Sequence, residues 1–173
     1  NGVSRPVTIT GGTFYASKAE MGGVLYTAGK AVITGGTFIG TGADTATTPN
    51  YGGLVYANGA ELTITGGTLT KNVSSTNGGA VYGTNCVLTI SDTEFVDNTS
   101  TSNGGAIYIS SGTLVSENNT FTGNSATNGG AIACVNGAIT VNGGTLSENE
   151  ASENGGAAYV SGSTGTFSIT NGT

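Results

Sequence analysis

Three acids in the middle of the chain, Asp92, Glu94 and Asp97, have the types and spacing best suited to chemistry. Clustered carboxylates can act as general acid and base on a glycosidic bond, or they can bind Ca²⁺. No arginine lies near them in the sequence, and the chain contains no histidine, which argues against nucleophilic triads. Acids in β-rich segments also keep such surfaces soluble. We therefore predict no enzyme activity, no cofactor and no metal site, and we retain polysaccharide processing by these acids as an alternative.

The charge of the chain restricts its partners. Charged residues make up 8% of the sequence and the net charge is −6, with four basic residues at Arg5, Lys18, Lys30 and Lys71. Because so few cations cannot form a phosphate-binding patch, we expect neither nucleic acid nor an anionic membrane surface as a partner. No run approaches the roughly 20 apolar residues of a membrane helix, so we expect no membrane insertion.

Internal repeats are the strongest signal in the sequence. A glycine pair followed by apolar residues recurs with its first glycine at six positions, in steps of 30, 26, 26, 25 and 26 residues. These positions are Gly22, Gly52, Gly78, Gly104, Gly129 and Gly155. A Thr-Ile-Thr-Gly-Gly-Thr-Phe motif at residues 8–14 returns in the same phase, and a third motif, Phe-x-x-Asn or Leu-x-x-Asn, closes the unit.

Each unit offers three short strand-like runs separated by Gly, Asn and Ser turns. Identical motifs that return in one direction indicate stacked coils, in which each residue lies on its counterpart in the previous coil. We predict an all-β fold, a right-handed single-stranded parallel β-helix (β-solenoid) with three short strands per coil, about 26 residues per coil and six to seven coils. Residues 1–173 are expected to form a single solenoid segment, a fragment of a longer repeat array.

Alternation predicts which side chains of the glycine-pair strand face inward. One column is apolar in every copy and is placed in the core: Leu25, Val55, Val81, Ile107, Ile132 and Ala158. The next column then points outward and gives our candidate ligand-binding residues, Tyr26, Tyr56, Tyr82, Tyr108 and Tyr159. A row of exposed rings can stack on sugars; the alternative is that the row is a packing ladder.

Other columns are expected to build the core. Phe14, Phe38, Leu69, Phe95, Phe121 and Leu146 form a bulky inward stack. Two asparagine columns can hydrogen-bond from coil to coil; one contains Asn72, Asn98, Asn124 and Asn149, and the other Asn77, Asn103, Asn128 and Asn154. Cys86 and Cys134 fall two coils apart, about 10 Å, which is too far for a disulfide, so we predict two free, buried thiols.

Two further features of the sequence concern the surface of the predicted solenoid. The Thr-x-Thr column of the second strand is typical of an ice-binding face, but Val32, Val115, Glu117 and Asn142 interrupt it. A loop around residues 41–50, containing Pro49, is longer than its counterparts and is expected to project from one corner.

The pairing of Gly-Gly-Ala-(Ile/Val) at residues 78–81, 104–107 and 129–132 with Phe-x-x-Asn at residues 95–98 and 121–124 resembles the repeat of chlamydial polymorphic membrane proteins. It is also similar to adhesin-like repeat proteins. The resemblance implies a secreted or surface-displayed passenger that adheres to host or neighbouring cells.

We therefore predict a non-catalytic structural or adhesive segment of an extracellular or cell-surface repeat protein, a stalk or adhesin passenger. Polysaccharide binding or processing is the alternative, and ice binding is the third hypothesis. The expected partners are a glycan or a host or neighbouring cell surface, together with continuation of the same chain or end-to-end self-association.

Overall fold

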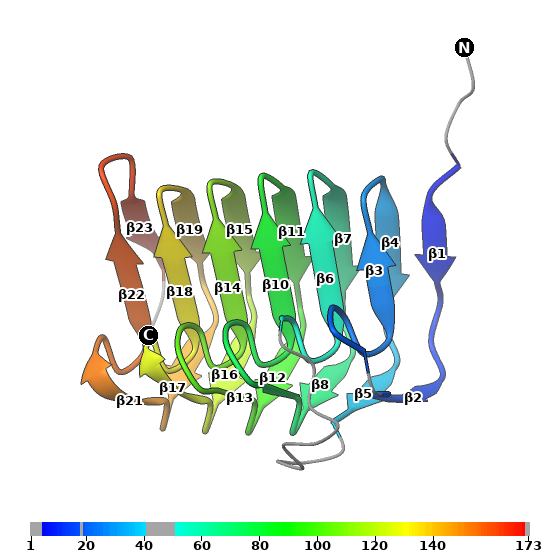
Figure 1. Cartoon of the computed structure of the whole chain (residues 1–173), viewed down its shortest axis with the longest axis horizontal. Coiled ribbons are helices and arrows are strands. Elements are labelled where there is room, and N and C mark those ends of the chain that lie inside the picture. The colour runs from blue at the N-terminus through cyan, green and yellow to red at the C-terminus, as the bar shows by residue number, and fades with distance from the viewer. Residues whose placement is uncertain (1–4, 18, 41–50, 172–173) are drawn as a thin grey trace.

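The computed structural model describes residues 5–17, 19–40 and 51–171. Within these residues every regular element is a β-strand, and the strands lie side by side along a rod whose first and last strands are at opposite ends (Figure 1). The sequence favours strands because Thr, Val and Ile suit a pleated sheet while Gly and Asn suit the turns between them. The long loop at residues 41–50 lies outside the described residues.

Three parallel sheets run the length of the rod. The tyrosine sheet holds β3 (Leu25–Thr27), β6 (Val55–Asn58), β10 (Val81–Thr84), β14 (Ile107–Ser110), β18 (Ile132–Val135) and β22 (Ala158–Ser161). The threonine sheet holds β1 (Val7–Ile9), β4 (Ala31–Thr34), β7 (Glu61–Thr65), β11 (Val87–Ser91), β15 (Thr113–Glu117), β19 (Ala138–Asn142) and β23 (Thr166–Thr170). The phenylalanine sheet holds β2 (Thr13–Tyr15), β5 (Thr37–Ile39), β8 (Thr68–Thr70), β12 (Glu94–Val96), β16 (Thr120–Thr122) and β20 (Thr145–Ser147).

The register confirms the predicted solenoid of about 26 residues per coil. Tyr82 pairs with Tyr56 on one side and Tyr108 on the other, and Phe95 pairs with Phe121. All pairings between these strands are parallel, and consecutive strands of each sheet come from consecutive coils. Each residue therefore lies on its counterpart in the next coil, as the repeat spacing predicts.

A fourth, short sheet was not predicted. It contains β9 (Val73–Ser74), β13 (Thr99–Ser100), β17 (Ser125–Asn128) and β21 (Glu150–Asn154), so these coils have four strands where three were expected. The one 25-residue step also falls here, because the pairing of β17 with β21 shifts register between Ala126 and Asn128. The coil that is one residue short therefore lacks that residue in the short sheet, next to a corner, and the three long sheets stay in register.

The core consists of the predicted inward columns. Val55, Val81, Ile107 and Ile132 are fully buried, as are the phenylalanines of β5, β12 and β16. Phe95 and Phe121 stack with ring centroids 4.7 Å apart. Cys86 and Cys134 are free and buried, as predicted, and burial raises the pKa of the Cys86 thiol to about 11, which keeps it protonated and unreactive.

A buried asparagine ladder joins the coils next to the phenylalanine sheet. The side-chain nitrogens of Asn72, Asn98 and Asn124 each donate to the Oδ1 of the asparagine one coil later, at 2.9 Å. That oxygen also accepts from the backbone N–H of the donating asparagine, at 3.0–3.1 Å. The second proton of the Asn98 amide goes to the carbonyl of Leu69, one coil back. The amides of Asn98 and Asn124 are thereby satisfied away from water, whereas the buried Oδ1 of Asn72, which begins the ladder, has no hydrogen-bond partner among the described residues.

The second asparagine column also forms a ladder, with the opposite polarity. Asn103 donates to Asn77, Asn128 to Asn103 and Asn154 to Asn128, at 2.8, 3.2 and 2.7 Å. This column is more exposed than the first, so its hydrogen bonds compete with water. The prediction that stacked amides hydrogen-bond from coil to coil is confirmed for both columns.

Replacing Asn98 with alanine tests the buried ladder. The change leaves the Asn72 backbone N–H without its acceptor and removes the amide donor to the Leu69 carbonyl, whereas the Asn124 Oδ1 still accepts from the backbone N–H of residue 98. Because a buried unsatisfied group costs about 1–3 kcal/mol, we expect the free energy of unfolding to fall by roughly 2–3 kcal/mol in urea titrations. Asn154→Ala, in the exposed ladder, is the control and should cost less than about 1 kcal/mol; equal losses would contradict the assignment.

The second glycine of every pair except the last offers another test, because its Cβ would collide with backbone. At Gly105 a methyl group would meet the Gly130 carbonyl and the backbone of Ser125, whereas at Gly156 the nearest atom is the Asn149 oxygen at 3.4 Å. We expect Gly105→Ala to destabilise by roughly 3 kcal/mol through overpacking. Gly156→Ala should stay within about 0.5 kcal/mol of the parent in the same thermal or urea unfolding assay.

Candidate functional site

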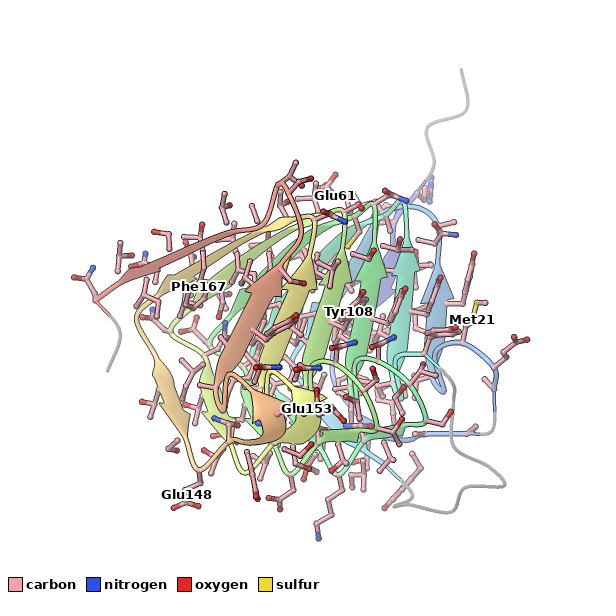
Figure 2. All side chains as sticks on the ribbon, turned by 60° about the vertical axis from the view of Figure 1, so that its left-hand side comes forward. Met21, Glu61, Tyr108, Glu148, Glu153 and Phe167 are labelled. Atoms are coloured by element: carbon pink, nitrogen blue, oxygen red, sulfur yellow. The ribbon has the colours of Figure 1, made fainter. Side chains whose placement is uncertain are left out.

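The candidate site is the tyrosine ladder, the outward column of Tyr26, Tyr56, Tyr82 and Tyr108 on the tyrosine sheet. These residues alternate with Val55, Ala57 and their counterparts, which lie in the core, so the tyrosines point outward as predicted. Figure 2 shows Tyr108 on this outer surface of β14. In-register pairing of the strands brings the rings directly over one another.

The rings stack face to face along the rod. Ring centroids are 5.4 Å apart for Tyr26 and Tyr56, and 4.8 Å apart for Tyr56 and Tyr82, with planes within 6° of parallel. Stacking covers the ring faces, and Tyr56 and Tyr108 keep 8% of their surface exposed. Tyr26, the first ring of the column, keeps 50% and has one face that no other ladder tyrosine covers. A sugar seeking a ring face would therefore meet Tyr26, and along the rest of the ladder it would meet ring edges.

Tyr51 also belongs to this surface, although the repeat pattern did not single it out. Its ring packs edge-on against Tyr56 and Tyr82, with centroids 6.2 and 5.1 Å away. Tyr51 occupies the column that continues as Asn77 and Asn103 in later coils, and bridges between backbones link these positions. Tyr51 could have been recognised in the sequence because it is an aromatic residue in a column that otherwise contains asparagine.

The column breaks at Ala133, which separates Tyr108 from Tyr159. Tyr108 is tilted by 34° relative to Tyr82, and Ala133 is completely buried. The missing ring therefore leaves no open slot on this face. Tyr159, one coil beyond, is partly buried on β22.

The three acids lie around β12 without forming a cluster that could hold a metal. Asp92 occupies the corner before the strand and Asp97 the corner after it, both with left-handed backbone, while Glu94 accepts a hydrogen bond from Thr68. Among the described residues no group of three or more His, Cys, Asp or Glu side chains is placed to bind a metal ion.

The hydroxyl rows of the threonine sheet are in register but interrupted. Thr63 and Thr89 stack on each other, with Val32 before them and Val115 after them. Glu117 lies between Ser91 and Asn142 in the neighbouring row and is exposed. A charged side chain thus stands within the face that the ice-binding hypothesis uses.

Burial shapes the electrostatics of the tyrosine ladder. It raises the pKa of Tyr82 to about 12, with smaller contributions from the neighbouring phenols of Tyr108, Tyr56 and Tyr51. The pKa values of Tyr56 and Tyr108 are raised as well, chiefly by burial. The phenols of Tyr56, Tyr82 and Tyr108 are therefore neutral at ordinary pH.

The raised pKa predicts how stability depends on pH. Tyrosine titrates near pH 10 in the unfolded chain and Tyr82 near 12 in the folded chain, so between these values the unfolded state loses a proton that the folded state keeps. Stability should be unaffected by this group below about pH 10 and should fall as the pH rises towards 12. Urea titrations across this range should show a shallower fall for Tyr82→Phe, which keeps the ring; an unchanged slope would contradict the prediction.

Comparison with known proteins identifies a repeat in two of the coils. The model of the Chlamydia polymorphic membrane protein repeat matches residues 92–110 and 120–135, which span β12 to β14 and β16 to β18. No curated protein and no solved structure matches the chain. Each matched segment contains a buried asparagine, the glycine pair and one strand of the tyrosine sheet, β14 or β18. These two coils are therefore similar to the repeat of chlamydial polymorphic membrane proteins, as the sequence motifs predicted.

Proposed function

We propose that this chain is a non-catalytic rod segment of an extracellular, cell-surface repeat protein that displays binding surfaces for glycans or for neighbouring or host cells. The observation that carries the proposal is the combination of the matched repeat with a core built entirely from coil-to-coil ladders. A solenoid with this repeat fits a surface repeat protein in general. The adhesive role is the more specific part of the proposal, and the experiment below tests it.

The geometry suits display because the rod is stiffened by continuous columns. Parallel pairing runs through every coil of the three long sheets, and the asparagine ladders connect successive corners. Such a rod holds its outer rows at a fixed distance from whatever anchors it. No helix long and apolar enough to cross a membrane occurs in the described part of the chain.

The best placed contact for a glycan is Tyr26. Its ring is half exposed, and the Asn58 side chain, from the next coil, donates to its hydroxyl at 3.4 Å, which places an amide at the hydroxyl end of the ring. An apolar face with a few adjacent polar groups is the usual composition of a small-ligand site.

A glycan array with purified protein tests this proposal. We expect binding to at least one glycan class, at least a tenfold loss in Tyr26→Ala, and a smaller loss in Asn58→Ala, because stacking on the open ring face is removed. Tyr15→Ala is the matched control, since Tyr15 is 65% exposed but lies on the phenylalanine sheet.

Two outcomes would overturn parts of the proposal. Absence of binding to any glycan or cell surface, with the fold intact by circular dichroism, would leave a stalk without an adhesive role. An equal loss in Tyr15→Ala and Tyr26→Ala would remove the tyrosine ladder as the contact surface.

A further inference from the structure

Four tyrosines form one continuous aromatic group in the middle of the rod. Strands β6, β10 and β14 carry Tyr56, Tyr82 and Tyr108 and lie side by side, with β3 and β18 beyond them (Figure 1). Tyr51 joins the group from the neighbouring column. Tyr82 is the centre of the group, because its ring contacts the other three. Its centroid lies 4.8 Å from Tyr56 and 5.1 Å from both Tyr51 and Tyr108.

The contacts of Tyr82 are of two kinds. Its ring is parallel to that of Tyr56, with 4° between the planes, so these two rings meet face to face. The ring of Tyr51 stands at 68° to that of Tyr82, so these two rings meet through an edge. A covalent bond between two tyrosines joins carbons on the ring edges, next to the hydroxyl groups, and leaves the rings twisted against each other. The Tyr51–Tyr82 pair is therefore closer to the geometry of such a bond than the stacked Tyr56–Tyr82 pair.

Phenols are the side chains of this region that lose an electron most readily. The chain contains no tryptophan. Cys86 and Cys134 are buried, and burial raises the pKa of both thiols, so they stay in the protonated form, which is slow to oxidise. Aromatic rings in contact exchange an electron rapidly. A radical that forms on any of the four phenols can therefore reach Tyr82.

We propose that Tyr51 and Tyr82 form an oxidative cross-linking site, which takes a one-electron oxidant, such as a peroxidase with hydrogen peroxide, and yields a dityrosine bond between two coils. Each phenol gives one electron to the oxidant and its hydroxyl proton to water. The two radicals join through one ring carbon next to each oxygen, and the hydrogens of these carbons move to the oxygens, which restores both phenols. The chain loses two hydrogen atoms in all, and hydrogen peroxide becomes two molecules of water.

The bond strengthens the rod where the exposed asparagine ladder is interrupted. Asn103 donates to the Oδ1 of Asn77, and Asn128 donates to that of Asn103. Tyr51 occupies the preceding position of this column and has no side-chain amide to continue the ladder. Tyr82 lies in the coil that follows Tyr51, so the bond joins the same two coils that an amide pair would join. This proposal goes beyond glycan display and does not rest on it.

Photo-oxidation with ruthenium tris(bipyridine) and persulfate, followed by trypsin, tests the bond. Persulfate takes up the two electrons and becomes two sulfate ions. Trypsin cuts after Lys30 and Lys71, which places Tyr51 on peptide 31–71 and Tyr82 on peptide 72–173. We expect dilute, folded protein to keep the mass of a single chain less two hydrogen atoms. After unfolding and digestion, the two peptides should appear as one species with dityrosine fluorescence.

Tyr51→Phe and Tyr56→Phe are matched variants, because each keeps its ring and removes one phenol from the same peptide. Tyr51→Phe should lower the yield of the linked species at least tenfold, whereas Tyr56→Phe should keep at least half of it. Retention in Tyr51→Phe, or an equal loss in both variants, would contradict the assignment of the bond to Tyr51. A wild type without the linked species, under conditions that oxidise the exposed Tyr15, would overturn the site as a whole.

Discussion

Each residue of this rod packs against its own counterpart in the neighbouring coils, at the spacing of parallel strands, about 4.8 Å. This constraint decides which side chains the interior accepts. An apolar side chain stacks on itself, as Phe95 does on Phe121. A polar side chain that recurs at a buried position in successive coils must be complementary to a copy of itself, and the asparagine amide, with both donor and acceptor, meets that condition. The buried ladder of Asn72, Asn98 and Asn124 is the result.

Departures from a column must be compensated by residues close by, because the coils on either side do not change. Ser116 replaces an apolar residue inside β15, and Asn119 at the next corner donates to its hydroxyl, donates to the Ile90 carbonyl and accepts from the Thr93 N–H. Gly83 similarly leaves room for the Cys86 sulfur from its own coil and the Ile109 side chain from the next. Neighbouring side chains thus supply the missing hydrogen bonds or fill the missing volume, and the long sheets stay in register.

The repeat spacing was enough to predict the solenoid, the coil length, the inward columns and both asparagine ladders, because stacking makes the period of the sequence the period of the structure. The fourth strand escaped prediction, since a paired run as short as Val73–Ser74 has no alternation to recognise. The corners were predicted from Gly and Asn, yet Lys71, Asp97 and Glu148 also adopt left-handed backbone there. The column position imposes that conformation against their local preference. The spacing also gave the outward direction of the tyrosines but not their ring orientation, which is set by packing.

The ring orientation bears directly on function. A tyrosine that recurs in successive coils stacks on its neighbours, so its ring faces are covered and are not accessible to ligands. The most strongly repeated residues are therefore the least available for binding, and binding falls to positions where a column begins, ends or changes residue. Tyr26 begins the ladder and Tyr51 enters it from another column. For this reason, the residues that reveal the fold of such a solenoid differ from those that bind a ligand. The first recur along a column, and the second lie where the same column begins, ends or changes residue.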